Sequence, residues 1–167
     1  MSPKATPGPQ LVDIERQLEA ASNQARSVVA GLSTGQLIER PEPHSWSVAE
    51  CLVHLTITAE SYFPILLAEL NRADWVTAVT GKTYKMDRVG RLMRWMLEPP
   101  ARIKVKTPAK FQPLNVDEPD EVLARFLDSQ ARMKECVARS EGLPLDEVKV
   151  NSPFSSRMSY NLLSCFN

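Results

Sequence analysis

Three long stretches of this chain carry apolar residues three and four positions apart, the spacing that lines one face of an α-helix. They are Leu11–Leu32, Val48–Leu70, and a stretch that begins near Pro119 and runs through Val137. A shorter stretch, Ser155–Asn167, has the same pattern. Amphipathic helices must bury their apolar faces against one another. The sequence therefore predicts an all-α fold, an up-down four-helix bundle.

Proline and glycine mark where these helices begin, bend or end. Gly31 ends the first helix, and Pro119 suits the first position of the third. Pro64 lies inside the second stretch, where it predicts a kink or a local break because proline has no N–H for the helix ladder.

An irregular basic excursion, Asn71–Asp117, separates the second helix from the third. Within it Met86–Leu97 has helical spacing, and Arg102–Lys106 alternates like a short strand. Lys82–Lys110 contains nine Lys and Arg against two acids, so it carries +7 while the rest of the chain carries −7. We interpret this stretch as a solvated surface. The alternative is a binding face for an anionic substrate or a nucleic-acid backbone.

The composition is that of a globular protein. The chain has 167 residues, 43% of them apolar and 24% charged, with a net charge of zero. We expect a single domain over residues 1–167, with a disordered start at residues 1–10. Cys51, Cys136 and Cys165 are widely spaced and odd in number, which is typical of reduced, mostly buried thiols. Without a secretion signal or an apolar run near the ~20 residues of a membrane span, we expect a cytoplasmic protein with no membrane partner.

The second helix begins with a motif that fixes its first residues. Ser47 can cap the free backbone N–H groups, and Glu50, three residues later, closes a capping box. Trp46 precedes the cap, where we expect it to pack as a hydrophobic staple on Cys51. We expect His44, in the proline-rich loop before this motif, to be an exposed loop histidine.

His54 lies about two turns inside this helix, and no histidine follows it. We expect it to face the bundle interior alongside Cys51, Thr58 and Ser61. A buried imidazole must make a hydrogen bond or ligate a metal, and Cys51 one turn earlier makes a Cys/His metal pair conceivable. The alternative is an ordinary core histidine beside a buried thiol. One histidine alone does not hold a catalytic metal.

The segment Trp46–Leu55, with the pattern W-S-x-x-E-x-x-x-H-L, resembles the start of the second helix in the DinB-like superfamily of four-helix-bundle proteins. The order of the helices agrees with that family, and the residues from Pro99 to Pro113 resemble one of its branches. The resemblance implies that His54 is one of three ligands to a divalent metal, nickel or zinc. It also implies that an H-x-x-x-H pair on the fourth helix completes the site.

The chain departs from this family pattern at its last helix. The expected fourth helix runs only about a dozen residues beyond Ser155 and contains no histidine. We expect either that this helix is truncated relative to the natural protein or that the protein has lost the metal site. Under both explanations, the implied metal is not held by this chain.

The resemblance favours a metal-dependent enzyme, a thiol transferase or a hydrolase, with a small-molecule substrate or a low-molecular-weight thiol as its partner. In such a site an open metal position lowers the pKa of a bound water or thiol. The alternative is a non-catalytic binding or interaction protein on the same bundle, for which a stress-related role is conceivable. A homodimer is a further hypothesis. A DNA-associated protein that uses Lys82–Lys110 is a third and weaker hypothesis, and we expect no nucleic-acid partner.

Overall fold

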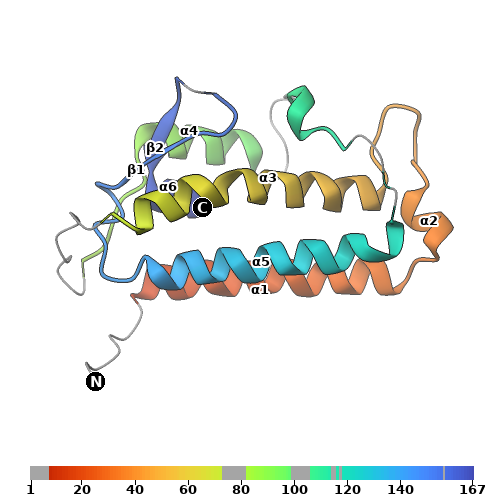
Figure 1. Ribbon diagram of the computed structural model, residues 1–167, viewed down its shortest axis with the longest axis horizontal. Helices are drawn as coiled ribbons and strands as arrows, with labels where there is room; N and C mark the ends of the chain where they lie inside the picture. The colour runs from red at the N-terminus through yellow and green to blue at the C-terminus, as the bar shows by residue number, and fades with distance from the viewer. Residues whose placement is uncertain (1–7, 73–81, 99–105, 114–115, 117, 156) are drawn as a thin grey trace.

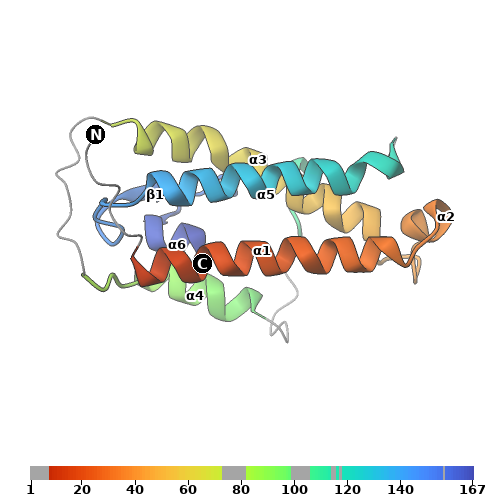
Figure 2. The same cartoon turned by 90° about the horizontal axis from the view of Figure 1, so that it is seen from below.

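The computed structural model describes residues 8–72, 82–98, 106–113, 116, 118–155 and 157–167. Three long helices, α1 (Pro9–Ala30), α3 (Val48–Leu70) and α5 (Val122–Arg139), lie alongside one another (Figures 1 and 2). Of these, α5 packs against both α1 and α3. Together with the shorter α4 (Arg88–Leu97), they make the mostly helical bundle that the sequence predicts.

Short helical elements close one end of the bundle. α2 (Thr34–Ile38) packs against α3 and against η2 (Pro119–Glu121), a 3-10 turn that leads into α5. The sequence did not predict α2, because its five residues are too few to show a helical period. A capping box formed by Ser33 and Gln36 nevertheless marks its start.

A two-stranded sheet and two helices close the other end (Figure 1). β1 (Lys149–Asn151) and β2 (Ser159–Asn161) pair antiparallel, with Val150 opposite Tyr160 and both side chains buried. α6 (Leu162–Phe166) follows directly, and α4 packs against both β2 and α6.

The predicted helix over Ser155–Asn167 is wrong for the first half of its length. Its residues 159–161 form β2, and helix begins only at Leu162, where the Asn161 side chain accepts a hydrogen bond from the Ser164 N–H. A backbone hydrogen bond joins the start of this helix to the loop between α5 and β1: the Leu162 N–H donates to the Val148 carbonyl at 2.9 Å. Periodicity over so few residues does not distinguish a buried strand from a helix, which explains the error.

α3 has the bounds and the capping box that the sequence predicts. The Glu50 N–H donates to Ser47, and the Ser47 N–H donates back to the Glu50 carboxylate at 2.8 Å. Arg40 pairs with the same carboxylate, and this pairing is the main cause that holds the pKa of Glu50 below its ordinary value. Of the kink or local break predicted at Pro64, the break does not occur: the helix is continuous, and Pro64 is exposed.

The N-terminal prediction needs a correction at its boundary. Residues 1–7 lie outside the described residues, but Pro9 and Gln10 belong to α1 rather than to a disordered start. The Gln10 side chain holds the chain to the segment before α4, because it donates to the Tyr84 carbonyl at 3.0 Å and accepts from the Tyr84 N–H at 2.8 Å.

The helices enclose two apolar clusters. The cluster nearer the sheet includes Leu11, Ile14, Phe63, Leu66, Val137, Leu145, Val148, Val150 and Leu162. The cluster nearer α2 consists of Leu37, Ala49, Leu52, Val122 and Phe126. These contacts fix α3 between α5 and the shorter elements, and α3 supplies three of the side chains of the site described next.

α3 is also long and apolar enough to cross a membrane, judged by length and composition alone. Core helices of globular proteins pass the same test. Here α3 packs against α5 and contributes Phe63 and Leu66 to the core.

Candidate functional site

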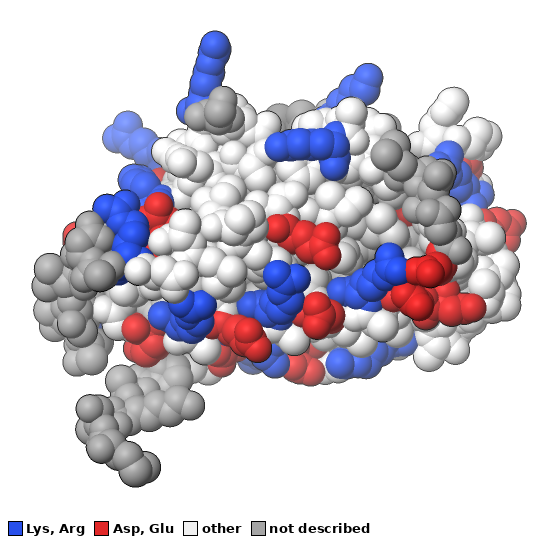
Figure 3. Space-filling view, in the orientation of Figure 1, with Lys and Arg blue, Asp and Glu red and all other residues white. Residues whose placement is uncertain are grey.

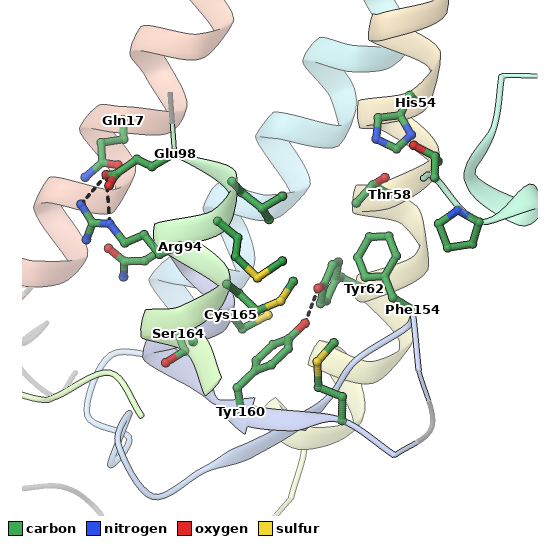
Figure 4. Close-up of a pocket in the computed structure, with 18 of the residues that line it drawn as sticks. Gln17, His54, Thr58, Tyr62, Arg94, Glu98, Phe154, Tyr160, Ser164 and Cys165 are labelled. Atoms are coloured by element: carbon green, nitrogen blue, oxygen red, sulfur yellow. Dashed lines mark hydrogen bonds and ion pairs between the residues drawn. The ribbon is translucent and has the colours of Figure 1, made fainter. Parts of the chain in front are cut away.

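A pocket of about 760 Å³ lies between α3, α4, β2 and α6 (Figure 4). Its walls are largely apolar and aromatic, formed by Tyr62, Met93, Met96, Leu97, Phe154, Met158 and Tyr160. About as many residues bring polar side chains to its lining: His54, Thr58, Gln17, Arg94, Glu98, Lys106, Thr107, Ser164, Cys165 and Asn167. More of the pocket surface is apolar than polar, as in many sites for small organic molecules.

α3 presents three of these side chains in one row. His54, Thr58 and Tyr62 are four residues apart, so each lies only about 40° around the helix from the one before. All three face the pocket (Figure 4). The prediction that His54 and Thr58 share an inward face is confirmed, and that face lines a cavity. Ser61, predicted beside them, is half-buried and does not line the pocket.

His54 is held by a hydrogen bond to the backbone. Its Nδ1 lies 2.7 Å from the carbonyl oxygen of Phe111, which is fully buried in η1 (Ala109–Phe111). Because a carbonyl only accepts, Nδ1 carries the proton, and Nε2 of the neutral imidazole is left as an acceptor. The Trp46 ring covers the imidazole, with 4.9 Å between the ring centroids. The site thus fixes both the position and the tautomer of His54.

Two expectations about the neighbours of His54 are wrong. Cys51 is exposed, so it does not share the inward face of His54. The reason is its position along the axis and not around it: residue 51 is only about 20° around the helix from residue 58, but it lies about 4.5 Å before His54, beyond the residues that line the pocket. Trp46, expected to pack on Cys51, has its ring against that of His54, inclined at 50° to it. The Cys51–His54 metal pair is therefore not formed.

The far end of the pocket carries a pair of tyrosines. The Tyr62 and Tyr160 hydroxyl groups are hydrogen-bonded to each other (Figure 4). Burial is the main cause that raises the pKa of both phenols above the ordinary tyrosine value. Both side chains are therefore neutral at ordinary pH, and they present rings and hydroxyl groups rather than phenolates to the pocket.

Cys165 is the one cysteine that lines this pocket. Burial raises the pKa of its thiol well above the ordinary cysteine value. The nucleophilic form of cysteine is the thiolate, and burial disfavours it. Cys165 therefore serves as a polarisable part of the wall rather than as an activated nucleophile.

Charged side chains lie at the edge of the pocket and over the outer surface. Arg94 and Glu98 form an ion pair at 3.0 Å beside Gln17 (Figure 4). Lys82, from the same basic stretch, pairs with Asp146 at 3.1 Å. Figure 3 shows basic and acidic side chains interleaved over α1 and α5. The pairings of Arg94 and Lys82 favour the solvated interpretation of the basic stretch, of which residues 99–105, including most of the predicted strand Arg102–Lys106, lie outside the described residues.

A comparison with protein families settles the relationship of this chain. The model of the DinB superfamily matches residues 17–163. The chain belongs to the DinB superfamily. No curated protein and no solved structure matches it. The matched region contains α3 with His54, α4 and β2, and with them most of the residues that line the pocket; Ser164, Cys165 and Asn167 follow it.

The metal site implied by the family resemblance does not fit the donors present. The chain has only one histidine besides His54, which is His44, exposed in the loop before α3 as predicted. Among the described residues, no group of three or more His, Cys, Asp or Glu side chains could hold a metal ion. His54 makes the backbone hydrogen bond that a histidine ligand commonly makes, but the described residues do not provide the other ligands of a metal site.

Sequence reasoning missed the aromatic part of the site. Phe154 and Tyr160 lie in and beside the β1–β2 hairpin, a region expected to be loop and helix. A signal was present, because Lys149-Val150-Asn151 and Ser159-Tyr160-Asn161 both alternate polar and apolar residues around a turn-rich segment.

Proposed function

We propose that this DinB-superfamily chain binds a small, largely apolar organic molecule in the pocket between α3, α4, β2 and α6. This is the non-catalytic binding function that the sequence left open beside a metal-dependent enzyme. The observation that carries the proposal is the pocket itself. Its volume of about 760 Å³ lies within the roughly 300–1,000 Å³ of small-molecule sites, its surface is more apolar than polar, and three methionines and three aromatic residues are among those that line it.

The physical basis for binding is burial of apolar surface. Each Å² of apolar ligand surface removed from water contributes roughly 25 cal/mol. Methionine side chains from two elements, Met93 and Met96 on α4 and Met158 before β2, supply polarisable walls that adapt to ligands of different shape. The two tyrosine hydroxyl groups already have a partner in the wall, since Tyr62 and Tyr160 are hydrogen-bonded to each other.

The metal-dependent transferase or hydrolase is supported less well. It would need ligands besides His54, and the described residues do not provide them. That a low-molecular-weight thiol is a partner of this chain stays a prediction.

A metal titration separates the two functions. We expect zinc chloride or nickel chloride, added to the chain in a calorimeter, to show no one-to-one binding, because a single imidazole gives neither the number nor the geometry of ligands for a stable site. His54→Ala should leave the titration unchanged. One-to-one zinc or nickel binding that disappears in His54→Ala would contradict this expectation and favour the enzyme.

Filling the pocket tests the binding function. We expect naphthalene to bind at one site, and the double variant Met93→Trp with Met158→Trp to weaken that binding by about ten-fold or more, because two indoles occupy apolar space from two walls. Naphthalene fluorescence in a titration measures the affinity.

The matched control adds the same bulk one residue away on each element. Leu92 and Arg157 are both exposed and do not line the pocket. Leu92→Trp with Arg157→Trp should therefore bind naphthalene as the parent does. Equal weakening in the two double variants, or no binding of naphthalene by the parent chain, would overturn the proposed function.

A further inference from the structure

α4 has two faces that point in opposite directions. Residues spaced three and four apart form its inner face, and each of them lines the pocket: Gly90, Met93, Arg94 and Leu97. Residues at the same spacing form its outer face, and all of them are exposed: Arg88, Arg91, Leu92 and Trp95. The helix lies along one edge of the molecule in Figure 2, so its outer face is open to a partner.

The outer face exposes large apolar side chains. Leu92 is 56% exposed and Trp95 is 49% exposed, and Val89 and Leu97 beside them are exposed as well. Of the eight large apolar side chains that are exposed in the described part of the chain, the ten residues of α4 carry four. Single exposed apolar residues are ordinary, whereas a group of them marks an interaction surface.

The same face carries two positive charges without acidic partners. Arg88 and Arg91 form no ion pair with the described residues. The neighbouring charges are paired, because Arg94 binds Glu98 and Lys149 binds Asp87. The two free guanidinium groups lie within one turn of Leu92, so positive charge and apolar surface occupy one face of the helix.

A bilayer with anionic headgroups fits both parts of this face. Tryptophan and leucine side chains of a surface helix insert among the headgroups and the upper acyl chains, while arginine side chains reach lipid phosphates. A nucleic acid would pair with the arginines but would give Leu92 no apolar surroundings. A second copy of the chain on a two-fold axis would bring the same face, with its positive charges, against itself.

We propose that the outer face of α4 docks the protein reversibly on an anionic phospholipid bilayer. The leucine and the tryptophan of this face insert between the headgroups, and its two arginines bind lipid phosphates. The expectation of no membrane partner came from the lack of an uninterrupted apolar run, and a helix that lies on a bilayer needs no such run.

The proposal goes beyond the proposed function and does not depend on it, although Leu97 connects the two surfaces. This side chain is 60% exposed and also lines the pocket. Docking through α4 therefore brings the edge of the pocket to the lipid, where apolar molecules dissolve.

Sedimentation with lipid vesicles tests the proposal. We expect the chain to sediment with vesicles made from equal parts of phosphatidylcholine and phosphatidylglycerol, and to stay in solution with vesicles of phosphatidylcholine alone. Arg88→Gln with Arg91→Gln should weaken binding to the anionic vesicles by about ten-fold or more, because two charges near the lipid surface are lost. Leu92→Ser should weaken it by about five-fold, because less apolar surface is buried.

The matched controls make the same changes on other helices. Arg125→Gln with Arg139→Gln removes two exposed arginines from α5, which lies on the far side of the molecule from α4 (Figures 1 and 2). Leu55→Ser changes a leucine of α3 that is 47% exposed. Both control proteins should bind the anionic vesicles as the parent does.

The outcomes show what covers this face. The proposal is overturned if the parent does not bind the anionic vesicles, or if the controls weaken binding as much as the α4 variants do. If the loss of the arginines weakens binding but Leu92→Ser does not, the face recognises charge alone, as for a nucleic acid, and the bilayer is wrong. A dimer of the parent that Leu92→Ser dissociates would show that a second copy covers the face, and would also overturn the proposal. None of these results bears on the proposed function, because the changed residues of α4 do not line the pocket.

Discussion

Replacing Phe126 with alanine is expected to lower the free energy of unfolding by about 3–5 kcal/mol, as is usual for a buried aromatic side chain. Phe126 is only 4% exposed, and it packs with Leu37, Leu52 and Val122 where α2, α3 and α5 meet. Its removal would leave a cavity between three elements that cannot all move inward together. Urea denaturation measures the loss as a lower midpoint at an unchanged slope.

The control for this prediction is Leu55→Ala, on the exposed side of α3. An exposed substitution of this kind changes stability by about 0.5 kcal/mol or less. If Phe126→Ala had the midpoint of the parent chain, α5 would not be part of the core as described.

Gly90→Ala is expected to cost about 3 kcal/mol, in the upper range for an overpacked core. Gly90 is buried in α4, and a Cβ built on it would lie 2.1 Å from both the Cβ and the Oγ of Ser164 in α6. Ser164 cannot move aside easily, because its Oγ accepts from the Asp87 N–H at 3.1 Å and its N–H donates to Asn161 at 2.9 Å. Thermal and urea unfolding measure the loss.

Two variants show whether the close approach of α4 and α6 is the cause. Adding Ser164→Gly to Gly90→Ala removes both clashing atoms and should recover part of the lost stability. Gly35→Ala, in α2, meets nothing within 4 Å and should be neutral or slightly stabilising, because alanine favours the helix. A Gly90→Ala variant as stable as the parent would show that α4 does not pack on α6 as described.

The long helices could be predicted from the sequence because their signals are local. Apolar residues at helical spacing, together with the Ser47–Glu50 capping box, placed α3 at its observed bounds. The β1–β2 hairpin was missed, since strands of three residues are defined by pairing with a distant segment rather than by their own period. The prediction of a helical bundle is correct despite this error, because α1, α3 and α5 form most of the core.

The candidate site was predictable only in part, for the same reason. His54 and Thr58 share a face of one helix, so the helical period alone placed them together. The Phe111 carbonyl that fixes the tautomer of His54 lies 57 residues further along the chain, and Tyr160 lies 98 residues from Tyr62. No local pattern encodes such contacts. Cys51 was placed wrongly because the helical period gives the face of a residue but not what lies beside it along the axis: Cys51 comes one turn before His54, beyond the residues that line the pocket.

The most direct test of the binding function uses the methionine methyl groups as reporters. In a protein labelled with ¹³C at these methyl groups, added 2-naphthol should shift the NMR signals of Met93, Met96 and Met158, because a bound aromatic ring lies against them. Met86 and Met133, which pack in the core outside the pocket, should keep their signals. Saturable shifts confined to the three pocket methionines are the result we predict. Shifts at Met86 or Met133 of the same size, or no shift at the pocket methionines, would contradict the account.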